Sequence, residues 1–509
     1  MKKTTLLALS LVNLFADDGF EAYKQNMTEE YNTYYQKEMK AYQGFVQTSD
    51  GIPNKINPYQ TINILPPPVV MKITAPLMTK PAEPVLGNNI IAPQAKILEK
   101  PQNMIPKGTP SGSQIDAVKL NTIDVSTLMA PPPPLISQTP SVQTTQTIQL
   151  SFFGLSLPID KTSVAFTQSL HASKEVSLLA DEIHKQDRAL VNRIRAIRSD
   201  YALNDWDTVV LTQALMNTIY AAKDQKLKTL HMIDILRGLG YKTLLAEGTD
   251  KKFYFLMPTK QPLYSKSFFV RNEVKHYLFT VEEHPRADTK VSLNFYSSQE
   301  DSQGVALDMR MVKDPLIATD PQTVNLKWDF ENKKYSMNVT LNKNLSALMD
   351  MYPQVDNDAY LQSRSGTKLV RELSSNLMNE SKNNHFTQEQ SIAFILRFVQ
   401  QAFTYKTDFD AYGYERPMFV EQTILLPYSD CEDRAILLSR LYQEALGLDT
   451  VGLRYPGHLS LGVSYGGKGD YYTAHNKNYY VTDGTYFYAA PGMSQPSFKN
   501  IKANILTTK

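Results

Sequence analysis

A second cysteine is missing from this sequence, because Cys431 is the only one among 509 residues. A single thiol forms no internal disulfide and builds no cysteine-rich zinc site. The chain therefore depends on neither a disulfide framework nor structural zinc of that kind. One retained cysteine is either a small buried apolar residue or a group used for thiol chemistry, and its neighbours decide between these alternatives.

Charge of one sign is also scarce, since the formal net charge is +2 and charged residues make up 20% of the chain. A protein that binds nucleic acid through its phosphates needs a surplus of Lys and Arg, so we expect no nucleic-acid partner. No glycine-rich phosphate loop is present. The histidines show no spacing typical of metal ligands. We therefore expect no metal and no cofactor.

Long apolar runs are absent as well. The longest one follows Met1-Lys2-Lys3 and reaches only to Ala16, which is too short to cross a bilayer. A basic start, a short apolar stretch and a small residue are typical of a secretory signal peptide. We predict a signal peptide over 1–16, no transmembrane segment and a periplasmic or secreted protein. The alternative is an uncleaved N-terminal anchor.

Two segments follow that do not look like a compact domain. Residues 17–47 carry aromatic and methionine side chains at helical spacing, which predicts an amphipathic helix that docks on a partner or packs on its own protein. Residues 48–149 hold runs of three and four prolines among many polar residues. That composition buries too little apolar area to offset chain entropy, so we predict a disordered, proline-rich spacer.

The remaining chain predicts an α+β protein. Residues 150–284 read as helices followed by short alternating strands, 285–364 as a β-rich, sandwich-like module, and 365–509 as a C-terminal α+β domain. A sequence similarity links the first region, 150–284, with the last, 365–509. The segments 224–240 and 431–447 are each an apolar-faced helix that ends in Leu-Gly before a strand-like run. The first segment lacks the cysteine, so 150–284 would be a non-catalytic copy.

The neighbours of Cys431 favour thiol chemistry. The segment 428–435 reads YSDCEDRA, and apolar residues at helical spacing follow it, so Cys431 lies in the first turn of a helix. The helix dipole favours a thiolate there, and backbone N–H groups can receive an oxyanion. We interpret Glu432, Asp433 and Arg434 as structural, and Asp408 in the preceding loop as a loop cap.

Two further residues complete a pattern. His458 begins an alternating strand after Pro-Gly, and Asp483 closes a later strand in the sequence TDGTY. A thiol, an imidazole that deprotonates it and a carboxylate that orients the imidazole are the groups needed for nucleophilic acyl transfer. The sequence therefore predicts that Cys431, His458 and Asp483 converge.

These motifs resemble the transglutaminase-like branch of the papain-like cysteine protease superfamily, in particular an exported bacterial group of transglutaminase-domain proteins. The resemblance covers about 365–500, and extends weakly back to about 200. It implies a helix that starts at the cysteine and packs on an antiparallel sheet, a Cys-His-Asp triad, and Gln422 as an oxyanion-hole candidate. Two features depart from the group: Leu459-Ser460 replaces the usual aromatic after the histidine, and the long interval to Asp483 implies an extra hairpin.

Two functions stay open. The first is an exported thiol enzyme that acts on protein, peptide or cell-wall amides through an acyl-thioester, as a peptidase, deamidase or transglutaminase. The second is a non-catalytic envelope scaffold that binds a partner through a degenerate transglutaminase-like fold.

Overall fold

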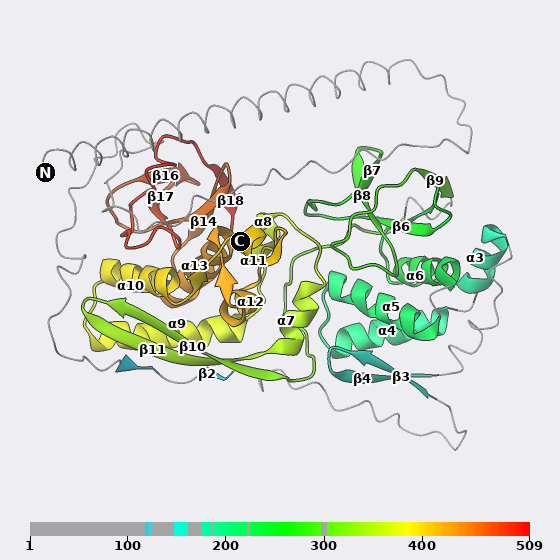
Figure 1. The fold of residues 1–509 in the computed structure, drawn as a ribbon, viewed down its shortest axis with the longest axis horizontal. Helices are drawn as coiled ribbons and strands as arrows, with labels where there is room; N and C mark the ends of the chain where they lie inside the picture. The colour runs from blue at the N-terminus through cyan, green and yellow to red at the C-terminus, as the bar shows by residue number, and fades with distance from the viewer. Residues whose placement is uncertain are drawn as a thin grey trace, which may run out of the picture. The chain divides into compact units, whose positions relative to one another are not determined.

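The computed structural model describes residues 118–120, 123–124, 147–160, 175–185, 187–220, 224–296 and 303–509. The predicted signal peptide (1–16), the aromatic-striped helix (17–47) and most of the proline-rich spacer (48–149) lie outside the described residues. Within these, the fold mixes helices with antiparallel sheets, as the α+β prediction requires (Figure 1). We call residues 147–318 the N-terminal lobe and 319–509 the C-terminal lobe.

The C-terminal lobe begins with a long antiparallel hairpin and ends in a five-stranded antiparallel sheet. The strand order in the sheet is β16-β17-β15-β14-β18. The helix α13 precedes the sheet and packs on it. The elements are β10 (Pro321–Phe330), β11 (Lys333–Asn342), α7 (Lys343–Asp350), α8 (Asn357–Gln362), α9 (Thr367–Asn383), α10 (Gln388–Gln401), β12 (Thr404–Tyr405), α11 (Asp408–Tyr412), α12 (Val420–Leu425), β13 (Tyr428–Ser429), α13 (Cys431–Leu446), β14 (Thr450–Tyr455), β15 (His458–Val463), β16 (Tyr471–Ala474), β17 (Lys477–Thr482) and β18 (Asn504–Thr507).

The N-terminal lobe repeats this plan. It too begins with an antiparallel hairpin and ends in a five-stranded antiparallel sheet, of order β7-β8-β6-β5-β9. The helix α6 precedes that sheet. The elements are β3 (Thr147–Phe152), β4 (Leu155–Asp160), α3 (Val176–His184), α4 (Arg188–Asp200), α5 (Asp205–Ile219), α6 (Gln225–Gly238), β5 (Leu244–Gly248), β6 (Phe253–Pro258), β7 (Phe268–Arg271), β8 (Val274–Phe279) and β9 (Leu293–Tyr296).

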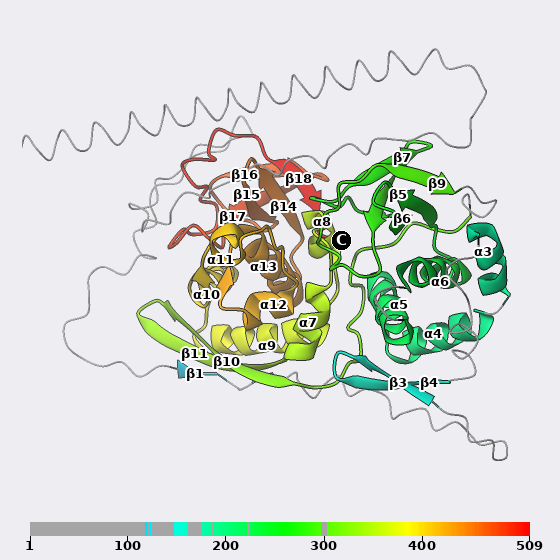
Figure 2. The ribbon, with the colours of Figure 1, turned by 45° about the vertical axis from the view of Figure 1, so that its right-hand side comes forward.

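The two sheets have the same connectivity. In chain order, the five strands after α6 take the same sheet positions as the five strands after α13, and all the pairs that build both sheets are antiparallel. The first strand begins 19 residues after the helix start in both lobes, from 431 to 450 and from 225 to 244. Figure 2 shows each sheet with its helix beneath it.

Burial patterns explain why each sheet is stable. One face of each sheet packs on helices and belongs to a core that runs through both lobes. The opposite face of each sheet carries a small apolar cluster of its own, around Leu453 and Tyr472 in one lobe and around Leu256 and Leu278 in the other. Every residue of β6 and of β15 is buried, and in β6 this appears in the sequence as a nearly continuous apolar run, FYFLMP.

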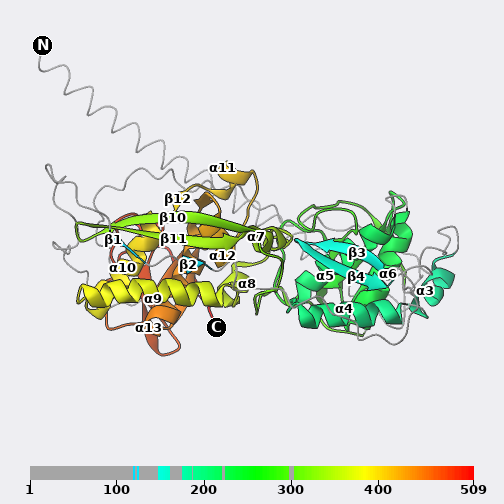
Figure 3. The same cartoon turned by 90° about the horizontal axis from the view of Figure 1, so that it is seen from below.

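The expected β-sandwich-like module over 285–364 is not present. Its first strand, β9, is the edge of the N-terminal sheet, and 321–342 is a single hairpin followed by helices. The alternating pattern predicted strands correctly but could not tell which partner each strand pairs with. In Figure 3 the hairpin β10–β11 lies along α9 and α10, and β3–β4 lies along α5.

The spacer boundary also needs correction. The globular lobe starts at β3, three residues before 150, and two short strands inside the expected spacer pair in parallel with β11. These are β1 (Val118–Lys119) and β2 (Ile123–Asp124). These two strands thus pair with the edge of the hairpin, a contact that composition alone does not reveal. No helix in the described part of the chain has the length and apolar character needed to span a bilayer.

Candidate active site

The helix α13 places Cys431 at its first residue. Asp430 is the N-cap, and a reciprocal capping box with Asp433 fixes where the helix begins. The Asp430 N–H donates to Asp433 Oδ2 at 3.2 Å, and the Met418 N–H donates to Asp433 Oδ1 at 2.9 Å. Asp433 is therefore structural, as expected. The thiol itself is partly exposed.

Arg434 anchors the same helix from inside. The side chain is fully buried, and its guanidinium donates to three backbone carbonyls, including Gly484 O at 3.1 Å and Phe403 O at 2.7 Å. A Cβ at position 484 would lie 2.9 Å from the Arg434 Cβ, which explains the glycine after Asp483. Arg434 thereby fixes the cysteine helix against the loop that carries the predicted acid.

The imidazole and the carboxylate meet as predicted. His458 is the first residue of β15, and its Nε2 lies 2.8 Å from Oδ2 of Asp483, which directly follows β17. Both side chains are almost entirely buried. The other carboxylate oxygen accepts hydrogen bonds from Thr485 N, Thr485 Oγ1 and Tyr486 N. Asp483 is thus held in one orientation by donors on its own loop.

The electrostatics favour a charged pair. Burial lowers the pKa of His458, but the Asp483 carboxylate and then a hydrogen bond with Cys431 outweigh it and raise that pKa to about 10. Burial raises the pKa of Asp483, yet the charge of His458 and the hydrogen bonds to Asp483 hold it below its ordinary value. His458 and Asp483 therefore form a hydrogen-bonded pair, and Cys431 is one of the groups that act on the histidine.

Two side chains support His458 that the sequence did not identify. The Phe498 ring stacks on the imidazole, with centroids 4.6 Å apart and planes 7° from parallel. Gln495 Nε2 donates to Asp483 Oδ2 at 3.1 Å. Phe498 supplies an aromatic neighbour to the histidine in place of the one that Leu459 and Ser460 lack. The extra hairpin expected between His458 and Asp483 is β16–β17.

Gln422 does not take the role expected of it. Its Oε1 accepts from Phe419 N at 3.3 Å, and its Nε2 donates to Ser346 O and Asp350 Oδ1 at 3.4 and 3.1 Å. The side chain is buried, and these hydrogen bonds hold its amide to α7 and to the start of its own helix. The short helix α12 turns the amide inward, which a count of nine residues before the cysteine could not foresee.

Tyr405 is a neighbour of the thiol that the sequence missed. Its strand β12 pairs with β13, two residues before Cys431, and the Arg434 guanidinium lies 5.4 Å from its ring centre. Burial and then the negative charge of a Cys431 thiolate raise the pKa of Tyr405. The phenol is therefore a neutral hydroxyl close to the sulfur.

A cluster of five carboxyl groups, four of them buried, also lies at the thiol. The Cys431 Sγ donates to Glu432 Oε2 at 3.1 Å. Around it, oxygens of the cluster lie within 4.8 Å of one another in overlapping groups of three. The cluster consists of Asp408, Glu415, Asp430, Glu432 and Asp433. Glu432 is thus more than structural, and Asp408 is not simply a loop cap.

The acid cluster cannot remain fully ionised in this setting. One oxygen each of Asp408, Asp430 and Glu432 accepts no hydrogen bond from the described residues. Burial first, and then the neighbouring carboxylates, raise the pKa of Glu432 well above its ordinary value and that of Asp408 to about 10. Two states relieve the repulsion: protons held by the carboxyls, or a divalent cation of the kind that prefers oxygen ligands.

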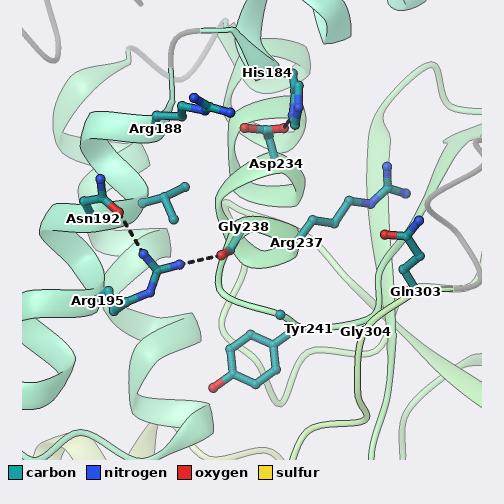
Figure 4. A pocket seen from close by; sticks show the side chains of 12 residues that line it. His184, Arg188, Asn192, Arg195, Asp234, Arg237, Gly238, Tyr241, Gln303 and Gly304 are labelled. Atoms are coloured by element: carbon teal, nitrogen blue, oxygen red, sulfur yellow. Dashed lines mark hydrogen bonds and ion pairs between the residues drawn. The ribbon is translucent and has the colours of Figure 1, made fainter.

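A cavity of about 550 Å³ lies in the N-terminal lobe, apart from these residues. Figure 4 shows Arg195 bridging Asn192 and the Gly238 carbonyl, while Arg188 extends toward the hydrogen-bonded pair of His184 and Asp234. None of the residues that line it belongs to the predicted triad.

Comparison of the chain with protein families, with characterised proteins and with solved structures gives no match in any of the three.

Proposed function

We propose that the C-terminal lobe is a thiol enzyme that acts on amides through an acyl-thioester. The observation that carries this proposal is the 2.8 Å contact of His458 with Asp483, beside a cysteine at the start of a helix. The resemblance of the surrounding motifs to transglutaminase-like proteins supports the same chemistry.

Each group has a defined task in this proposal. His458 removes the proton from the Cys431 thiol, and the thiolate attacks the amide carbonyl carbon. First-turn N–H groups of α13, which have no helical acceptor, stabilise the negative oxygen. His458 then donates its proton to the departing amine, and the thioester remains on Cys431. Asp483 stabilises the imidazolium and fixes its orientation throughout.

Peptide hydrolysis, glutamine deamidation and amide transfer share the thioester and differ in the amide that is attacked and in the molecule that then attacks the thioester. Water releases an acid, as in peptide hydrolysis or glutamine deamidation, and an amine gives amide transfer. We favour hydrolysis, since an exported protein meets peptide and cell-wall amides in water. Export itself is proposed from residues 1–16.

One observation favours the alternative of a non-catalytic envelope scaffold. The thiol donates to Glu432, and ionised carboxyls around it would oppose a negative sulfur. If this arrangement keeps the sulfur protonated, the transglutaminase-like fold would serve only to bind a partner.

A library experiment decides between these functions. The full chain is incubated with mixed peptides and amine donors, and the products are identified by mass spectrometry. The enzyme proposal expects hydrolysed, deamidated or amine-linked peptides with the wild type and none with Cys431→Ala. Equal product profiles for the two proteins would refute it.

A further inference from the structure

A cavity of about 630 Å³ opens between the two lobes. The N-terminal lobe contributes residues near β7 and after β8. The C-terminal lobe contributes the end of α7, α11 and the loop after α11. A volume of this size accommodates a few side chains of a bound molecule. The residues used below are His284, Arg286, Asp350, Phe409, Tyr414 and Glu415.

The cavity lies next to the candidate active site. Glu415 lines it, and a carboxyl oxygen of Glu415 lies within 4.8 Å of one of Glu432. Glu432 in turn accepts the thiol of Cys431 at 3.1 Å. Two side-chain contacts therefore separate the cavity wall from the sulfur, which is a suitable distance for a subsite that binds residues flanking a reacting amide.

The walls are fixed by contacts across the lobes. Arg286 Nε donates to Tyr352 O at 2.9 Å, and its Nη1 donates to the Tyr414 hydroxyl at 3.0 Å. The segment near 351 is also held from the N-terminal lobe, where Trp206 Nε1 donates to Met351 O at 2.7 Å. The cavity is thus formed before any ligand arrives, which lowers the entropic cost of binding.

The cavity is electrically balanced. Arg286 is its permanent cation, and Asp350 lies 3.8 Å from the guanidinium. Burial lowers the pKa of His284, so that ring is neutral near pH 7, and burial raises the pKa of Glu415. Asp350 also pairs with Arg416, so these charges already have partners in the protein, and a neutral ligand group adds no further charge to desolvate.

Aromatic rings provide the apolar part. Tyr414 is 43% exposed, and its ring centre lies 5.5 Å from the Arg286 guanidinium. Phe409 lines the same cavity. Exposed aromatic rings beside a fixed guanidinium favour a flat or long apolar group packed on the rings and an acceptor oxygen at the spare N–H groups of Arg286.

We propose that this cavity is the recognition subsite for polypeptide substrates. It takes an aromatic or long aliphatic side chain on Phe409 and Tyr414, and Arg286 donates to a backbone carbonyl of the same peptide. The inference rests on the proposed function, since it makes the N-terminal lobe one wall of the substrate site of Cys431.

The test uses a full-length Cys431→Ala chain, which binds without turnover, and a random hexapeptide library. Retained peptides are sequenced by mass spectrometry. We expect enrichment of Phe, Tyr, Trp, Leu or Met over charged residues at one peptide position, by about tenfold or more. Tyr414→Ala should abolish that preference, and Tyr414→Phe should keep it because the ring remains. Arg188→Gln, in the other cavity, is the matched control and should change nothing.

The outcomes separate the two proposals. Retention of no peptide, or a preference that survives both Tyr414→Ala and Phe409→Ala in folded protein, overturns the subsite. Peptides bound with the expected preference but never modified by the wild type would leave the subsite standing and remove the enzyme. Products formed without any apolar preference would support the enzyme and overturn the subsite.

Discussion

The two lobes share one architecture and differ at the points where chemistry is expected. Both have a helix that leads into five antiparallel strands of the same order. Each position of the predicted triad has a counterpart by its place in these elements: the first residue of the helix, the first residue of the second strand, and the residue after the fourth strand. The counterparts of Cys431, His458 and Asp483 are Gln225, Phe253 and Thr280.

In the N-terminal lobe, two of these counterparts bind each other: the Gln225 side chain forms hydrogen bonds with the Phe253 backbone. The Gln225 amide donates to Phe253 O, and Phe253 N–H donates to Gln225 Oε1 at 2.8 Å. The helix start is thus held to the strand start where the C-terminal lobe has a thiol and an imidazole. The comparison teaches that the shared strand order forms in the N-terminal lobe without a thiol, an imidazole or a carboxylate at these positions.

The largest stability difference between the lobes should come from the fourth residue of the helix. Arg434 and Lys228 occupy that position, and both are buried. Arg434→Ala removes a guanidinium bound to three carbonyls and leaves them unpaired, which should cost about 3–5 kcal/mol. Lys228→Ala should cost less, since Lys228 has one partner, Glu282, at 3.4 Å. Chemical denaturation measures the free energy of unfolding of both variants. Equal decreases would contradict the expected difference between the two lobes.

Stability should depend on pH through the acid cluster of the C-terminal lobe. The pKa of Asp408 rises from 3.8 to about 10 on folding, so the folded chain holds a proton that the unfolded chain releases. Stability therefore declines as pH rises from about 3.8 towards 10. Asp408→Asn should flatten this decline by up to about 1.4 kcal/mol per pH unit. Asp410→Asn, at an exposed position on the same helix, serves as the control.

A divalent cation is the other way to neutralise these carboxyls, and the described part of the N-terminal lobe contains no comparable group. If the cluster binds Ca²⁺, the melting temperature at pH 8 rises with added CaCl₂ and falls with EDTA. The gain is about 2.7 kcal/mol at a hundred times the dissociation constant. Asp430→Asn should reduce the gain. An unchanged melting curve would show that protons alone relieve the repulsion.

The smallest change in stability is expected from the hydrogen bonds between Gln225 and Phe253 in the N-terminal lobe. Gln225→Ala leaves the backbone groups of Phe253 without these partners, so the free energy of unfolding should fall by about 1–3 kcal/mol. Gln149→Ala, on an exposed strand position, serves as the control. If Gln225→Ala costs nothing, the amide does not hold the helix start to the strand.

The sequence predicted the local elements and the triad better than it predicted their partners. A lone cysteine before a helical pattern, a Gly-His strand and an Asp-Gly strand identified Cys431, His458 and Asp483, because each signal is local. Phe498, Gln495 and the acid Glu415 were missed, since they reach the site through loops whose path depends on tertiary contacts. Gln422 was wrong for the same reason, because its direction is set by packing against α7.

The fold shows the same limit. The similarity between 224–240 and 431–447 indicates two related helix-and-sheet units. The alternating pattern nevertheless predicts that the first unit ends at 284 and that a separate module covers 285–364. The strand β9 pairs with β5 across more than forty residues, and no periodicity encodes that partner. Alternation shows that a strand has two faces, but it does not show which sheet the strand joins.

One measurement tests the central claim that His458 activates Cys431. Because the chain has a single cysteine, the rate of iodoacetamide alkylation across pH 5 to 9 reports that sulfur alone. The account predicts that the wild type reacts rapidly below pH 7, and that His458→Ala slows it to the rate of an ordinary thiol while Thr280→Ala has no effect. Equal rates for wild type and His458→Ala at every pH would contradict it.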